Sequence, residues 1–220
     1  MKMRVLWTAV ILLSLIAVAA VVRRTVAFYS QGAPGGIDSE FSAHKALTMF
    51  HMIPGLVFIL VGPFQFSRKL RARRPRLHRI AGRVYLCAGL VTGVSAIMMS
   101  PQIAIGGANE TAATLLFACV FLFALAAGFR DALRRRFVPH RQWMIRAYAI
   151  GLAIATIRPI VGAFFATRSI THLTPHDFFG IAFWIGFTLH LIAAEVWISS
   201  TGPTGVSVEA NARRPAAPRP

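Results

Sequence analysis

Apolar residues in this chain run in six long blocks, which are separated by short polar segments rich in Lys, Arg, Gly and Pro. Each block approaches the roughly 20 apolar residues that a helix needs to cross the roughly 30 Å hydrocarbon core of a membrane. The pattern predicts spanning helices over residues 5–22, 43–66, 80–99, 111–128, 143–165 and 178–198. The expected fold is therefore an all-α, polytopic bundle of about six transmembrane spans.

The first block has two interpretations. Lys2 and Arg4 precede it, which is also how a secretory signal peptide begins. Its apolar run is longer than the roughly 7–15 residues of a signal-peptide core, and Arg23 and Arg24 follow it directly. An uncleaved membrane anchor is the favoured interpretation, and a cleaved signal is the alternative.

The composition supports a membrane location. Hydrophobic residues make up 56% of the chain and charged residues only 14%, and the mean hydropathy is +0.61. Soluble domains typically carry about 25% charged residues. A disordered chain, a disulfide scaffold and an ordinary cytosolic enzyme are therefore excluded as overall classes.

Basic residues are distributed unequally between the two sides of the predicted bundle. The net charge is +17, and 19 of the 24 Lys and Arg residues fall on the side that carries both termini. Cytoplasmic loops carry such an excess, so both termini are predicted to be cytoplasmic, in a cell inner membrane. These loops are also expected to contact anionic lipid headgroups. Nucleic acid is not an expected partner, because no globular binding module remains outside the spans.

The domain organisation is simple. Residues 1–198 form one transmembrane domain, and no internal repeat is visible. Residues 199–220 are rich in Pro and lack an apolar pattern, so they are predicted to be a disordered cytoplasmic tail. Residues 30–40, with three Gly and one Pro, are expected to be an irregular outer loop. The oligomeric state is not indicated.

Several short motifs in the middle of the chain form a recognisable series. In order they are His51, Pro54-Gly55, Gly62-Pro63, Gln65, Arg71, Pro75, Leu77-His78-Arg79, Gly82-Arg83-Val84-Tyr85-Leu86, His140-Arg141-Gln142-Trp143-Met144, Arg146, Tyr148-Ala149 and Arg158. Together they resemble a bacterial family of predicted multi-pass membrane proteins labelled only as a domain of unknown function. The resemblance covers roughly residues 45–165. It implies a multi-helix membrane fold and carries no established activity, substrate or catalytic residues.

Ionisable residues inside the spans are the candidate functional groups, because they are costly in a membrane and usually face the bundle interior. His51 and Arg158 lie at matched depths, roughly 12 and 11 Å from the outer surface, and His190 lies roughly 18 Å deep. His78 and His140 follow prolines, which favour the first turn of a helix, so both are expected where helices enter from the cytoplasm.

One hypothesis from these positions is a b-type haem protein that transfers electrons across the membrane to a redox partner or quinone. His78 with His140 would ligate an inner haem iron and His51 with His190 an outer one. Arg158, Arg79 or Arg141 would pair with the propionates. The arrangement more distantly resembles the cytochrome b561 group, which takes its ligands from four successive helices. The fourth span here has no histidine, which weakens the outer site most.

The alternative is binding or transport of an anionic lipid or other amphiphile by Arg79, Arg141 and Arg158. A buried polar network that contains His51 and Arg158 stays open, as do a small transporter and an outer zinc site. Zinc would draw on four histidines, His44, His51, His172 and His176. Common hydrolase and nucleotide-binding motifs are missing from the sequence, so catalytic residues stay unknown.

Two further pairs of residues are predicted from depth alone. Arg146 and Glu195 both lie about three residues from the cytoplasmic ends of their spans, which favours a structural ion pair. Cys87 and Cys119 differ in depth by roughly 8 Å, more than a disulfide usually allows. Packing as small apolar residues is favoured for the cysteines, although boundary errors leave a bridge open.

Overall fold

The computed structural model describes residues 2–30 and 37–201, and every regular element in these two segments is a helix. Three helices are short: α2 (Ile37–Ala43), α4 (Arg68–Arg73) and α8 (Arg168–Thr171). Six are long and apolar enough to span a membrane. They are α1 (Lys2–Tyr29), α3 (Lys45–Gln65), α5 (Pro75–Ile103), α6 (Gly107–Leu133), α7 (Phe137–Ala166) and α9 (Pro175–Thr201). The predicted number of spans is confirmed, whereas their orientation stays a prediction.

The helices extend beyond the apolar blocks that predict them. α1 continues through Arg23 and Arg24 to Tyr29, so both arginines are helical rather than part of a loop. α9 ends at Thr201, which makes the predicted disordered tail wrong for its first three residues. Residues 202–220 of that tail lie outside the described residues. The reason is that hydropathy marks the part of a helix at hydrocarbon depth, while backbone hydrogen bonding continues into the polar region.

The predicted irregular loop at residues 30–40 also needs a correction. Residues 37–43 form α2, and residues 31–36 lie outside the described residues. Asp38 and Glu40 occupy the first turn of α2, where negative side chains favour a helix through its dipole. Asp38 also forms ion pairs with Arg23 and Arg24 of α1, which hold the short helix against the bundle.

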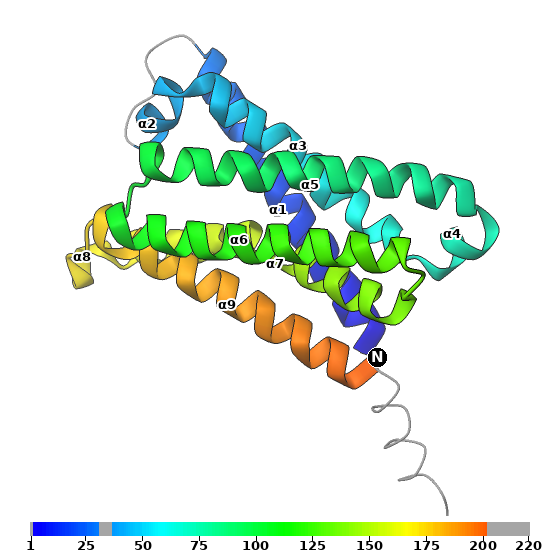
Figure 1. The fold of residues 1–220 in the computed structure, drawn as a ribbon. Helices are drawn as coiled ribbons and strands as arrows, with labels where there is room; N and C mark the ends of the chain where they lie inside the picture. Colours follow the sequence, from blue (N-terminus) through cyan, green and yellow to red (C-terminus); the bar gives the residue numbers. More distant parts are fainter. Residues whose placement is uncertain (1, 31–36, 202–220) are drawn as a thin grey trace, which may run out of the picture.

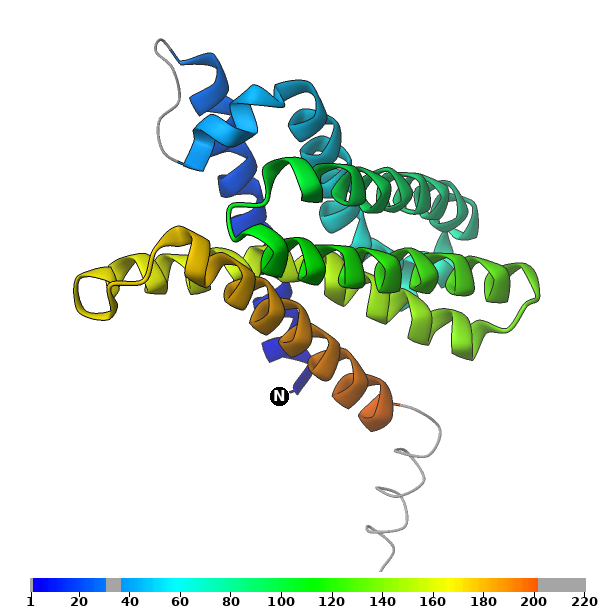
Figure 2. The same cartoon turned by 60° about the vertical axis from the view of Figure 1, so that its left-hand side comes forward.

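The long helices pack in chain order. α3 contacts α5, α5 contacts α6, α6 contacts α7, and α9 lies against both α7 and α6. Figures 1 and 2 show α5 and α6 side by side along the bundle, while α1 crosses it at a steep angle, in contact with α3 and α7. We call the end that carries α4 and the α6–α7 turn the basic end. The opposite end, with α2, the α5–α6 turn and α8, is the far end (Figure 1).

An aromatic cluster forms the middle of the core. Phe58 and Tyr85 are only 1% and 2% exposed, and their rings stack with centroids 4.1 Å apart. Phe121 meets Phe58 edge-on at 5.2 Å. The Tyr148 hydroxyl donates a hydrogen bond to the Ile59 carbonyl at 3.2 Å. Membrane helices pack through small residues that allow close approach, so large rings here depend on glycines opposite them.

α1 is the least enclosed of the six long helices. One side of it packs on α3 and α7, while apolar side chains such as Ile11, Leu15 and Val26 are more than half exposed. In a membrane, such a surface faces lipid without cost. Near its end, α1 turns Ala17, Ala20 and Arg24 toward a cavity in the bundle.

Candidate functional site

A cavity of about 240 Å³ lies in the far half of the bundle. Its walls come from the ends of α1, α5 and α7 and the beginnings of α3, α6 and α9, with one residue from α2. Most of the lining side chains are apolar. The polar exceptions include four ionisable residues, Arg24, His51, Glu110 and Arg158, and four hydroxyl residues, Thr48, Thr92, Ser100 and Thr114.

Arg158 is the cation that the cavity leaves without a partner. It lies on α7, is exposed, and lines the cavity. Among the described residues it makes no hydrogen bond and no ion pair. Asp38 and Glu110 interact with it electrostatically at longer range. A guanidinium therefore lies within a membrane span, with its five N–H donors available to a molecule in the cavity.

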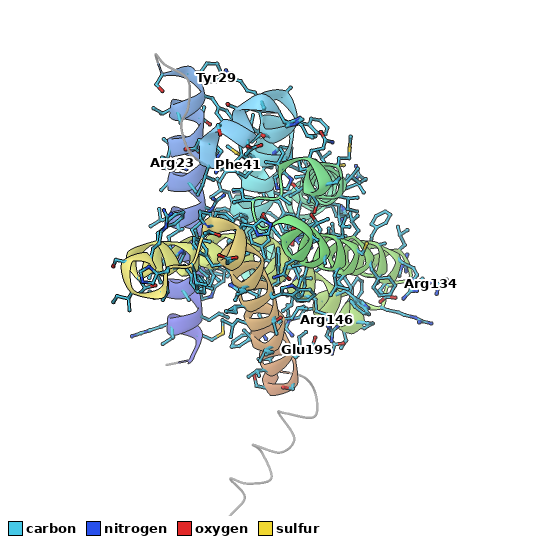
Figure 3. The ribbon with its side chains drawn as sticks, turned by 90° about the vertical axis from the view of Figure 1, so that its left-hand side faces the viewer. Arg23, Tyr29, Phe41, Arg134, Arg146 and Glu195 are labelled. Carbon is cyan, nitrogen blue, oxygen red and sulfur yellow. The ribbon has the colours of Figure 1, made fainter. Side chains whose placement is uncertain are left out.

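Arg24, unlike Arg158, already has a carboxylate that compensates its positive charge. It is 3% exposed, its Nε lies 3.2 Å from Asp38 Oδ1, and its guanidinium stacks 3.5 Å from the Phe41 ring centroid. Arg23 holds the same carboxylate through two hydrogen bonds of 2.8 and 3.2 Å. Figure 3 shows Arg23 and Phe41 close together where α1 meets α2.

Asp38 lies outside the membrane-spanning helices. Its hydrogen bond from Arg23 lowers the pKa of the Asp38 carboxyl below its usual value, with a further contribution from Arg24 and against the effect of burial. Asp38 is therefore a fixed anion at neutral pH, and α2 supplies the negative charge that α1 needs.

Glu110 supplies a second carboxylate. It is 6% exposed in the first turn of α6, and its Oε2 accepts a hydrogen bond from the Gly106 N–H at 2.7 Å. Burial disfavours the ionised form of Glu110, whereas the backbone donor, the helix dipole and the charge of Arg158 favour it. Sequence reasoning missed Glu110, since the predicted span begins one residue after it. It also assigned Arg24 to a loop.

His51 presents one nitrogen to the cavity. Its Nδ1 lies 3.1 Å from the Thr92 carbonyl and 3.0 Å from Ser95 Oγ. A carbonyl can only accept, and the Ser95 hydroxyl donates to the Val91 carbonyl at 2.6 Å, so we assign the ring proton to Nδ1. Nε2 has no hydrogen-bond partner among the described residues, and it carries a lone pair because burial beside Arg158 disfavours a charged imidazole. His51 is a neutral acceptor in the cavity wall.

The histidines expected to form an outer haem site are not brought together. His190 lies on α9, and its Nε2 is 2.7 Å from Thr156 Oγ1 on α7. It does not line the cavity that His51 faces. The cavity volume is also below the roughly 300–1,000 Å³ of typical pockets for drug-sized ligands. This set of donors and this space do not fit a haem held by two histidines in the far half.

The other predicted pair lies at the basic end. His78 and His140 are close enough to interact electrostatically. The Nδ1 of His140 lies 2.7 Å from the Gly128 carbonyl, whereas the buried Nδ1 of His78 has no partner within the described part of the chain. The haem ligation expected of this pair stays a prediction.

The three arginines that the sequence suggested for binding an anionic amphiphile, Arg79, Arg141 and Arg158, lie at two different ends of the bundle. Arg141 donates from both Nη atoms to Thr201 Oγ1 at 3.3 Å, at the basic end. Arg79 is exposed at that same end. Arg158 is 17 residues along α7 from Arg141, which corresponds to about 25 Å of helix. The three arginines therefore do not form one site.

The depth-matched pair of Arg146 and Glu195 is confirmed, with N–O distances of 2.5 and 2.9 Å. Cys87 and Cys119 are both free, so they form no disulfide with each other, but both are exposed, which does not agree with the predicted packing positions. Within residues 2–30 and 37–201, no group of three or more His, Cys, Asp or Glu side chains is placed to hold a metal ion.

Comparison with known proteins gives one match. The model of the family described as "Predicted membrane protein (DUF2306)" matches residues 48–198. No curated protein and no solved structure matches the chain. The match runs from the beginning of α3 almost to the end of α9, so it includes the last span, which the resemblance over residues 45–165 leaves out. Because it covers more than half of the sequence, the chain belongs to the DUF2306 family of predicted membrane proteins.

Proposed function

We propose that this integral membrane protein binds, and moves or presents, an anionic amphiphile in the far-half cavity, with Arg158 contacting the headgroup. The observation that carries the proposal is a guanidinium that lines a mostly apolar cavity and has no hydrogen-bond or ion-pair partner among the described residues. An amphiphile combines the two features that such a cavity recognises, an anionic group and an apolar chain.

The energetics support an anionic occupant. An arginine near the centre of a membrane helix costs about 2.5–3.5 kcal/mol on insertion scales. Arg146 on the same helix offsets such a cost with a carboxylate, whereas Arg158 has none in contact. A carboxylate or phosphate group in the cavity would accept two parallel hydrogen bonds from the Arg158 guanidinium.

The remaining lining suits the rest of such a molecule. Phe121, Phe183 and Phe187 belong to the apolar wall, which would enclose a hydrocarbon chain. His51 and Thr92 add hydrogen-bonding atoms to the same cavity. Compared with the sequence-based alternative, the proposal keeps Arg158 and gives up Arg79 and Arg141, which lie at the other end.

The binding experiment uses the purified full chain in a neutral detergent. Fluorescent cis-parinaric acid is titrated against the wild type, Arg158→Gln and Arg158→Lys. We expect Arg158→Gln to weaken binding at least about ten-fold, because charge-assisted hydrogen bonds are lost. Arg158→Lys keeps the charge and should recover part of the affinity. Arg168→Gln is the matched control, since Arg168 is exposed on α8 and does not line the cavity. Equal affinity in the wild type and Arg158→Gln would overturn the proposal.

Haem-linked electron transfer is the second candidate function, and one observation favours it: His78 and His140 come within electrostatic range at the basic end. A bound haem would supply the redox chemistry, and these two residues would hold the iron. Optical spectra of the same preparation, air-oxidised and then dithionite-reduced, test it. A Soret band that disappears in His78→Ala and His140→Ala would support this candidate. A colourless protein from haem-replete cells would exclude it.

A further inference from the structure

The charges around the cavity are few enough to be counted one by one. Three cations, Arg23, Arg24 and Arg158, interact with one another electrostatically. Two carboxylates, Asp38 and Glu110, interact with the same group. His51 is neutral, because burial in the cavity wall beside Arg158 disfavours a charged imidazole. Residues 31–36, which are outside the described part of the chain, carry no ionisable side chain in the sequence.

Both carboxylates are already engaged. Asp38 accepts from Arg23 and lies 3.2 Å from Arg24, while Glu110 accepts from the Gly106 backbone. Three positive charges and two negative charges leave one positive charge on the empty site. That charge is carried by Arg158, the one cation of the group without a hydrogen-bond or ion-pair partner among the described residues.

In a low-dielectric site, a ligand binds best when it neutralises the residual charge without replacing it by one of the opposite sign. We propose, on the basis of the function proposed above, that the ligand is a single-chain amphiphile with a monoanionic headgroup. A neutral headgroup would leave Arg158 uncompensated. A dianionic headgroup would leave an unpaired negative charge beside Glu110 and Asp38.

The volume of the cavity limits the ligand to one chain. About 240 Å³ corresponds to roughly eight water molecules at about 30 Å³ each. This space holds a headgroup and the adjoining part of one hydrocarbon chain, and the two long chains of a phospholipid do not enter it together. Two sources share the required chemistry, a free fatty acid with its carboxylate and a lysophospholipid with a phosphodiester.

Competition against bound cis-parinaric acid at about pH 8 tests the charge of the ligand. The competitors have similar chains: palmitate and lysophosphatidylglycerol are monoanions, hexadecyl phosphate carries close to two charges, and hexadecanol is neutral. We expect a monoanion to compete about ten-fold better than either hexadecyl phosphate or hexadecanol. The order of palmitate and lysophosphatidylglycerol, together with mass spectrometry of lipid that co-purifies, distinguishes the two sources.

A variant that changes the charge of the site tests the same inference without changing the hydrocarbon chain of either competitor. Glu110→Gln removes one negative charge while its amide oxygen still accepts from the Gly106 N–H, so the residual charge rises to two. We expect hexadecyl phosphate to gain about ten-fold relative to palmitate in this variant. Glu40→Gln is the control, because Glu40 is exposed on α2 and does not line the cavity.

The outcomes separate the two proposals. If no probe binds, or if Arg158→Gln binds as the wild type does, the proposed function fails and the charge inference fails with it. If the probes bind through Arg158 but the dianion competes as well as palmitate, the charge inference alone is overturned. It is also overturned if Glu110→Gln leaves the ratio between the two unchanged.

Discussion

Arg146 and Arg158 lie on the same helix, twelve residues apart, in opposite environments. Arg146 donates to both carboxylate oxygens of Glu195 and lies 4.7 Å from the Trp143 ring centroid. Figure 3 shows Arg146 and Glu195 together where α7 meets α9. Arg158 faces the cavity with no such partner among the described residues. An arginine whose donors are satisfied inside the fold contributes to the structure, whereas one whose donors remain available is a candidate for ligand binding.

Packing along α3 differs in the same way, as two of its glycines illustrate. A Cβ at Gly62, toward the basic end, would overlap the Tyr148 ring. A Cβ at Gly55, in the cavity wall, would come no closer than 3.5 Å to any other side chain, here the methyl group of Thr92. At the cavity, therefore, α3 leaves room for a side chain and Arg158 lacks an ion-pair partner among the described residues, in contrast to Gly62 and Arg146.

The largest effect we predict compares these two glycines. Gly62→Ala should destabilise the protein by about 2–3 kcal/mol, because the new methyl group displaces Tyr148 and strains a packed core. Gly55→Ala should be neutral or stabilising by up to about 1 kcal/mol, since alanine favours the helix. Unfolding by SDS in mixed micelles measures both variants. Equal destabilisation of the two would contradict the difference in packing between these two positions of α3.

The second prediction compares the two arginines directly by stability. Glu195→Gln should lower the free energy of unfolding by about 1–2 kcal/mol, a modest value because the Glu195 side chain is 53% exposed. Arg158→Gln should leave stability unchanged or slightly raised, since it removes an uncompensated charge. The same unfolding assay applies. Destabilisation by Arg158→Gln equal to that of Glu195→Gln would mean that Arg158 has a structural role.

Much of the fold was predictable because the membrane constrains position along one axis. Six apolar blocks gave six helices, and depth alone matched Arg146 with Glu195. Arg158 stood out because it is a charge inside an apolar block. Arg24 and Glu110 were missed for the converse reason, since they lie just beyond the apolar blocks, in turns of α1 and α6 that hydropathy does not mark.

Predicted depth does not give the rotation of a helix about its axis, and therefore does not show which neighbouring helix a side chain faces. His51 and His190 are not far apart in predicted depth, yet one contacts α5 and the other contacts α7. The blocks are so apolar on all sides that their pattern selects no interior face. Close contacts between helices, such as Gly62 against Tyr148, determine which face of each helix points into the bundle. The spacing of residues in the sequence does not reveal these contacts.

The smallest predicted effect concerns Asp38, the fixed anion that compensates α1 in the far half. The hydrogen bond from Arg23 lowers the pKa of Asp38 in the folded protein. Ionised Asp38 therefore stabilises the fold at pH values above about 3.9, the pKa of an aspartate in the unfolded chain. That contribution is lost as the pH falls through the lower, folded pKa. Asp38→Asn keeps an oxygen that can accept from the buried Arg24, and the Arg23 side chain is 60% exposed, so the substitution should cost no more than about 1 kcal/mol at neutral pH.

Thermal unfolding in detergent, from neutral to strongly acidic pH, measures this contribution. The difference between the wild type and Asp38→Asn should be constant near neutrality and disappear at the acid end, while Glu40→Gln matches the wild type throughout. A difference that persists at the acid end would show that α2 is held by contacts other than this ion pair. Asp38 would then not be the anion that compensates α1, and the contrast between a paired Arg24 and an unpaired Arg158 would lose its electrostatic basis.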